Sequence, residues 1–224
     1  MELTVENLSC RRAGRRVFAG LSFRLRSGEA ALLKGPNGSG KSSLLRVLAG
    51  LVGVEGGSVR LGDVSLTGDR ESFQERVAYA GHLDAVKPQF SVRDNLAAWA
   101  ALYGADEVRV GPALERFGLG RIADFPAAFC SAGQKRRLGL ARLMVLDRPL
   151  WLLDEPTVSL DVASTAIFAD LVRAHVAAGG LAIAATHVAL GLEGGPEIGL
   201  GGPPAPDAPA PPPDHDEFLA GDWR

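Results

Sequence analysis

A glycine-rich segment in the first quarter of the chain has the residue types of a phosphate-binding loop. Residues 35–42 read GPNGSGKS and fit the pattern G-x-x-x-x-G-K-[ST] in full. The glycines let backbone N–H groups converge on phosphate oxygens, the lysine reaches the β- and γ-phosphates, and the serine hydroxyl can ligate Mg²⁺. The alternative is that this segment is a glycine-rich turn that contains a lysine by chance and binds no phosphate. The predicted nucleotide contacts are Gly35, Pro36, Asn37, Gly38, Ser39, Gly40, Lys41, Ser42 and Ser43.

Two adjacent carboxylates, Asp154 and Glu155, follow the apolar run 150–153. A buried strand presents such residues at its carboxyl end, where open α/β sheets bind their ligands. Asp154 suits a Mg²⁺ contact, through water, and Glu155 can polarise an attacking water as a general base. Many strands end in acidic residues before a turn, so the pair gains its meaning from the phosphate loop that precedes it.

A second anion site is predicted from the segment Ser131, Ala132, Gly133 and Gln134. Basic residues and an apolar pattern of helical period follow it. The serine hydroxyl and the backbone N–H groups at the start of such a helix face forward, with the helix dipole behind them.

The elements that position these residues alternate between strand and helix patterns, which favours an α/β fold with a parallel sheet. Closely spaced early strands predict an added N-terminal antiparallel piece. Strand-like runs lie near residues 3–5, 21–25, 30–33, 59–61, 77–80, 150–153 and 181–185, and helical patterns follow residue 41 and cover 134–145 and 161–178.

A helical insertion is predicted at about 84–146, inside a domain of residues 1–200. Ser91 can cap its first helix, with Asp94 in the first turn, and residues 111–117 form a second one. Residues 201–224 are rich in proline and alanine and end in an acidic peptide with Phe218 and Trp223. This tail is either frayed or a tethered peptide that docks on a partner.

The composition of the chain excludes several classes of protein. The 224 residues are 46% hydrophobic and 22% charged, so a sizeable core forms, and 24 basic against 26 acidic residues give no general argument for nucleic-acid binding. Cys10 and Cys130 fit neither a zinc spacing nor a disulfide framework, which favours a reducing, cytoplasmic compartment. The N-terminus has no apolar signal core, and no apolar run reaches the ~20 residues that cross a bilayer. We therefore expect any membrane role to come through a partner.

Four motifs, in order over residues 1 to about 192, resemble those of the ATP-binding-cassette (ABC) ATPases. They are the phosphate loop, the segment CSAGQ (130–134), which is similar to the signature LSGGQ, the run DEPTVSLD (154–161), and Thr186-His187 after a strand. The resemblance implies a P-loop NTPase core that hydrolyses ATP with Mg²⁺. It also implies a homodimer in which residues 131–134 of one copy cap the γ-phosphate bound by the other.

The same resemblance implies roles for single residues. Asp161 links the two sites across the dimer, and His187 contacts the γ-phosphate and holds the attacking water. Without the resemblance, His187 reads as a histidine that ends a buried strand. His82 stands next to Gly81 where the family has a glutamine. Because Mg²⁺ prefers oxygen ligands, a coupling role is expected for His82 rather than a metal contact.

Two further departures concern the base and the signature. No aromatic residue lies near Arg11 or Arg12 to stack on adenine, so either a guanidinium stacks there or Val17 packs against the base. Cys130 stands where the family has leucine and is expected to behave as a small buried apolar residue.

The chain also resembles the ATPase subunits of bacterial haem exporters used in cytochrome c maturation. The likeness is carried by the Gly-His pair, the SAGQ segment before basic residues and the tryptophan before DEP, whereas Thr157 departs from those subunits. That likeness implies integral membrane partner subunits and a peripheral position on the cytoplasmic face of the inner membrane. It implies no contact with haem and no nucleic acid. The loop 82–91 faces such a partner or is an ordinary solvent loop. The alternatives are the ATPase of another ABC transporter, for lipid, drug or import, and a soluble ABC ATPase acting on nucleic acid.

Overall fold

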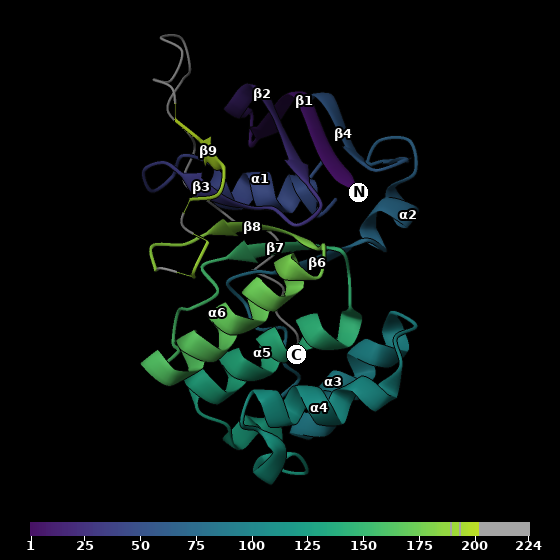
Figure 1. Ribbon diagram of the computed structural model, residues 1–224, viewed down its shortest axis with the longest axis vertical. Helices are drawn as coiled ribbons and strands as arrows, with labels where there is room; N and C mark the ends of the chain where they lie inside the picture. The colour runs from purple at the N-terminus through teal and green to yellow at the C-terminus, as the bar shows by residue number, and fades with distance from the viewer. Residues whose placement is uncertain (189, 193, 202–224) are drawn as a thin grey trace.

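The computed structural model describes residues 1–188, 190–192 and 194–201. Figure 1 shows a central parallel sheet with an antiparallel sheet on one side and a group of helices on the other. Apolar side chains fill both faces of the parallel sheet, so one core lies between the two sheets and a second lies between the parallel sheet and the helices.

The parallel sheet has five strands in the order β6-β7-β8-β3-β9. Their bounds are β6 Val77–Ala80, β7 Leu150–Asp154, β8 Leu181–Ala185, β3 Ala30–Lys34 and β9 Glu197–Gly199. Every residue of β7 and β8 is buried, which explains why both read as continuous apolar runs. Since β3, β8 and β7 are neighbours and parallel, the segments that follow their carboxyl ends meet at one edge of the sheet.

The antiparallel sheet has the order β2-β1-β4-β5. Its strands are β1 Glu2–Arg12, β2 Arg15–Arg26, β4 Gly56–Leu61 and β5 Val64–Ser65. β1 and β2 form a hairpin whose two turn residues, Ala13 and Gly14, both have positive φ, the geometry of a type I′ turn.

Helix α1 (Lys41–Leu48) lies between the two sheets and buries Leu44, Leu45, Val47 and Leu48. The short helix α2 (Arg70–Gln74) precedes β6. On the other face lie α5 (Ala132–Leu146) and α6 (Val162–Ala177), and beyond them α3 (Val92–Leu102) and α4 (Val110–Arg116), as Figure 1 shows. Three 3₁₀ turns, Glu107–Arg109, Gly120–Ile122 and Ala127–Phe129, connect these helices.

The predicted fold class is confirmed: the core is α/β, and it carries the antiparallel piece and the helical segment. The predicted cap is present, since Ser91 Oγ accepts from the Asp94 amide over 3.0 Å. Neither the three 3₁₀ turns nor the short elements α2, β5 and β9 were predicted, because each is too short to show a period. β9 pairs with β3 beside the phosphate loop. All but the first residue of the predicted tail 201–224, including Phe218 and Trp223, lie outside the described residues.

Within the described ranges, none of the helices has the length and the apolar character that a bilayer crossing requires. The division into a domain of residues 1–200 with an insertion at about 84–146 stays a prediction. Its last helix, α5, contacts α3 and α4 on one side and β6 on the other.

Candidate active site

The phosphate loop (residues 35–42) connects the end of β3 to the start of α1. Gly35, Gly38 and Gly40 have φ values of 151°, 78° and 99°, which side chains rarely tolerate. Space is also limiting at Gly40, where an added Cβ would lie 2.5 Å from Cγ1 of Val17. The loop therefore keeps its shape only with glycine at these positions, and that shape leaves the backbone open to phosphate oxygens.

The Lys41 ammonium is held inside this loop. Its Nζ donates to the carbonyl oxygens of Gly35 at 2.7 Å and Pro36 at 3.0 Å. The hydroxyl of Ser39 is buried and has no hydrogen-bond partner among the described residues. A buried donor of this kind needs an acceptor, and a phosphate oxygen bound in the loop would be one. A cavity of about 290 Å³ opens beside Lys41, lined also by Gly35, Thr186 and His187.

Asp154 ends β7 and is 4% exposed. Its Oδ1 accepts from Ser42 Oγ at 2.9 Å, and its Oδ2 accepts from the Tyr79 hydroxyl at 3.2 Å. Burial, and then the charge of Asp154, raise the pKa of Tyr79, so the phenol stays a donor. In the part of the chain that the structure describes, no cluster of three or more His, Cys, Asp or Glu side chains could hold a metal. The hydroxyl–carboxylate pair is nevertheless the oxygen donor set that suits Mg²⁺ once a nucleotide contributes further oxygens.

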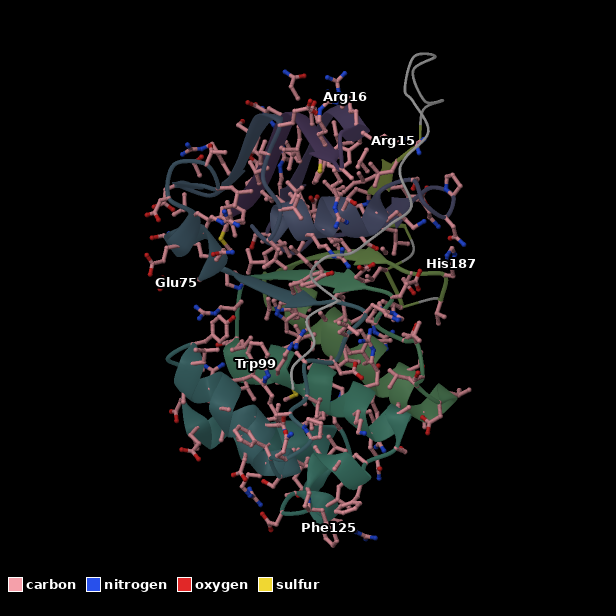
Figure 2. The ribbon with its side chains drawn as sticks, turned by 180° about the vertical axis from the view of Figure 1, so that it is seen from behind. Arg15, Arg16, Glu75, Trp99, Phe125 and His187 are labelled. Carbon is pink, nitrogen blue, oxygen red and sulfur yellow. The ribbon has the colours of Figure 1, made fainter. Side chains whose placement is uncertain are left out.

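Glu155 and His187 face each other across the ends of β7 and β8. Oε1 of Glu155 lies 3.6 Å from Nε2 of His187. The Glu155 amide donates to the Ala185 carbonyl at 2.8 Å, and the residue has a left-handed φ of 45°. His187 is 70% exposed at its side chain, and Figure 2 shows it at the edge of the molecule, level with the parallel sheet. A carboxylate and an imidazole so placed can hold one water between them and a phosphate.

The segment 131–134 starts α5 with a capping box. Ser131 Oγ accepts from the Gln134 amide at 3.2 Å, and Gln134 Oε1 accepts from the Ser131 amide at 2.7 Å. Ser131 and Ala132 are exposed, and none of the four residues is among those that line the cavity beside Lys41. Within one chain, the two predicted anion sites are therefore separate surfaces.

Comparison with known proteins agrees with this geometry. The family model described as "ABC transporter" matches residues 18–158. The chain belongs to the ABC transporter family. The predicted family and the predicted ATPase class are thereby confirmed, with the phosphate loop, the acidic pair and the whole helical segment 84–146 inside the matched range.

Relatives of this ABC protein match most of its length. It is 52% identical over 193 residues to the cytochrome c biogenesis ATP-binding export protein CcmA of Ruegeria pomeroyi, covering 86% of this chain and 88% of the relative. It is 50% identical over 204 residues to the CcmA protein of Bradyrhizobium diazoefficiens, covering 90% and 99%. Among solved structures, an ATP-binding-cassette protein, MJ0796, described as a dimer with ADP and phosphate, superimposes with a TM-score of 0.77 at 20% identity, covering 88% of this chain and 94% of that one.

The remaining predicted residues of the ABC protein occupy the following places. Asp161 caps α6, its Oδ1 accepting from the Ser164 amide at 2.7 Å, and these hydrogen bonds lower the pKa of its carboxyl. His82 is exposed on the loop after β6. Their roles across a dimer or toward a partner stay predictions.

For the base, the structure shows the surroundings of two of the three candidates, and which group contacts adenine stays a prediction. Arg11 Nε donates to Glu55 Oε1 at 2.8 Å, so its guanidinium already has a carboxylate partner, whereas Val17 lies against the phosphate loop at Gly40. The prediction for Cys130 needs correction, because it is half-buried rather than buried. It stands at the C-cap of a 3₁₀ turn directly before the capping box, and partial burial raises the pKa of its thiol.

Three residues that sequence reasoning missed surround this site in the ABC protein. Tyr79 contacts Asp154, as described above. Arg136 and Arg142 are 4% and 6% exposed, and their guanidinium groups bond to backbone carbonyls. Burial, with the nearby Arg136 charge, lowers the pKa of Arg142 to about 10, and its guanidinium carbon lies 5.0 Å from the centre of a tryptophan ring in α3, that of Trp99. For the two arginines, the signal that the sequence offered was their position six residues apart within an otherwise apolar helix.

Proposed function

We propose that this chain is the ATP-hydrolysing subunit of a membrane exporter used in c-type cytochrome biogenesis, with haem or a haem-bearing complex as the cargo. The observation that carries the proposal is the identity of about half of all aligned residues to proteins named CcmA, over 86–90% of the chain. The site geometry supplies the matching chemistry, since it offers a phosphate cradle, an oxygen pair for Mg²⁺ and a carboxylate beside an imidazole.

Hydrolysis at this site divides among four groups. Lys41 and the backbone of the phosphate loop hold the β- and γ-phosphates, and Ser42, with Asp154 acting through water, is suited to hold Mg²⁺. Once held there, Mg²⁺ would neutralise negative charge that develops on the phosphates. Glu155 accepts the proton of the attacking water, and His187 orients that water against the γ-phosphate. The 3.6 Å between Glu155 and His187 supports this division.

The complete site needs a second copy of the chain. Ser131, Ala132, Gly133 and Gln134 begin a helix whose dipole favours an anion, and the first two are exposed away from the cavity beside Lys41. A head-to-tail homodimer brings this surface of one protomer onto the γ-phosphate held by its partner, with Asp161 at the interface. Because ATP then contacts both protomers, it stabilises the closed dimer.

The proposed dimer can be tested by placing a negative charge at Ser131, at the start of α5. Aspartate and asparagine both cap helices well, so Ser131→Asp and Ser131→Asn differ in one charge. We expect Ser131→Asp to abolish both ATPase activity and the ATP-dependent dimer, because it repels the γ-phosphate, while the affinity of the monomer for ATP is kept. Ser131→Asn serves as the matched control and retains both to a large extent. Full turnover by Ser131→Asp would exclude a trans site.

The proposed transport role can be tested by identifying the membrane proteins that bind the chain. We expect a tagged chain, extracted from membranes in detergent, to copurify with integral subunits that belong to cytochrome c assembly. The chain itself then sits on the cytoplasmic face of the inner membrane, bound through those subunits, and touches neither haem nor nucleic acid. Copurification with the subunits of a lipid, drug or nutrient transporter would favour the alternative within the same family.

A further inference from the structure

The guanidinium of Arg136 joins three segments of the chain that lie far apart in sequence. Its side chain, on the second turn of α5, is 5% exposed. Nη2 donates to the Glu155 carbonyl at 2.7 Å and Nε to the Pro156 carbonyl at 2.9 Å. Nη1 donates to the Gly81 carbonyl and to Asp84 Oδ1, both at 2.9 Å. One side chain therefore ties the helix after the capping box to the catalytic turn and to the loop after β6.

Glu155 needs such support because of its backbone. A φ of 45° is unfavourable for a residue with a Cβ and persists only where the surroundings impose it. On its amino side, the Glu155 amide bonds to Ala185 in β8. On its carboxyl side, the two successive carbonyls of Glu155 and Pro156 both bond to Arg136. The Glu155 carbonyl also accepts from the Val158 amide at 3.3 Å, so Arg136 is one of three contacts in the clamp that keeps the residue left-handed.

The chemistry of the clamp is specific to arginine. A planar guanidinium presents several N–H donors in fixed directions, which matches two neighbouring carbonyls, whereas an ammonium is a single point of charge. The buried cation is balanced by Asp84, whose side chain is 25% exposed. The side chain of Arg137, the next residue, bonds instead to the Phe117 carbonyl at 2.8 Å, at the end of α4 and away from Glu155.

We propose that Arg136 is a positioning residue for ATP hydrolysis, which holds Glu155 in the left-handed conformation that aims its carboxylate at His187. The inference rests on the proposed function, because it assigns Arg136 a task only if Glu155 is the general base. It predicts that Arg136 controls the rate of the chemical step and leaves nucleotide binding alone, since none of its bonds reaches the phosphate loop.

The test compares Arg136→Lys with Arg137→Lys, the same substitution one residue along the helix. Both are measured in the full chain together with the membrane subunits that copurify with it. For Arg136→Lys we expect kcat to fall about tenfold. A tenfold change in rate corresponds to the free energy that is needed to hold one residue with a Cβ in the left-handed conformation. KM and the affinity for ATP should stay within about twofold of wild type. Arg137→Lys should keep its kcat. An unchanged kcat in Arg136→Lys, or a higher KM with the same kcat, would overturn the proposal.

A second variant covers the case in which lysine, buried here, prevents folding. Arg136→Gln removes the buried charge and reaches at most one of the two carbonyls, so the same loss of kcat is expected from it. Asp84→Asn leaves the bonds from Arg136 to residues 155 and 156 in place and should lose far less activity than either. Equal losses in the Asp84 and Arg136 variants would show that attachment of the loop after β6, and not the position of Glu155, sets the rate.

A double substitution separates positioning from general damage. In a Glu155→Gln background the group being positioned is already disabled, so adding Arg136→Lys should leave the residual single-turnover rate unchanged. A further tenfold loss would contradict a role through Glu155. These outcomes are distinct from failure of the proposed function, which would appear as wild-type chain that neither binds nor hydrolyses ATP.

Discussion

Oε1 of Glu155 lies 3.6 Å from Nε2 of His187, and the two residues leave neighbouring parallel strands at the same edge of the sheet. The pair can share a water molecule without bonding tightly to each other. The proposed role of Glu155 as general base requires the charge of its carboxylate and not only its shape.

Glu155→Gln tests that dependence. The amide has the size of the carboxylate but accepts no proton, so we expect turnover to fall by at least about 100-fold, a typical contribution of a general base. ATP binding should survive, and the stalled chain should elute as a dimer on size exclusion with ATP present. Glu75→Gln is the matched control, because Glu75 is exposed and Figure 2 shows it at the opposite edge of the molecule from His187. A monomeric and fully active Glu155→Gln variant would refute the assignment.

Lys41→Ala tests the phosphate cradle. The Lys41 ammonium bonds to two carbonyls of its own loop, and its removal takes away the charge that meets the phosphates. We expect ATP binding to be lost in a titration with a fluorescent nucleotide, while Lys87→Ala, at an exposed lysine of the loop after β6, binds normally. Unchanged affinity in Lys41→Ala would contradict the cradle.

Two glycines of the phosphate loop should differ in how badly alanine is tolerated. At Gly38, where φ is 78°, nothing lies within 4 Å of an added Cβ, so only the backbone cost of about 1–2 kcal/mol applies. At Gly40, where φ is 99°, the new atom also collides with Val17. Urea unfolding without nucleotide should therefore show a larger loss of unfolding free energy for Gly40→Ala. Equal losses would mean that Val17 moves aside freely.

His175 should make the fold sensitive to acid. Its ring stacks on Trp151 with centres 3.9 Å apart, and a ring nitrogen lies 3.2 Å from the Leu181 carbonyl. Burial lowers the pKa of His175 below its ordinary value of about 6.5. The unfolded chain then takes up the proton at a higher pH than the folded one, so this contribution is complete above about pH 6.5 and is lost as the pH falls toward the lower, folded value.

The measurement is the melting temperature of wild type and of His175→Phe between about pH 7.5 and 5.5. Phenylalanine keeps an aromatic ring against Trp151 but does not titrate. We expect the wild type to lose more stability than the variant over this range. Parallel curves would show that the buried imidazole adds nothing to the acid sensitivity of the protein.

Much of the site could be predicted from the sequence because its parts are local. The phosphate loop, the capping box at Ser131 and the acidic pair at the end of β7 are each encoded within a few consecutive residues, and each forms its structure from its own backbone and nearest neighbours. Helices such as α5 and α6 were visible because their apolar residues repeat with the helical period.

Tertiary structure decided what connects these parts. The strand order β7-β8-β3 brings the residues that follow each strand to one edge, and no local pattern specifies that order. Arg136 and Tyr79 were invisible because their partners are chosen by packing: Arg136 binds three backbone carbonyls, which every residue carries, and Tyr79 meets Asp154 only because β6 pairs with β7. Local sequence therefore determines which chemical groups are available, while long-range packing determines which of them meet.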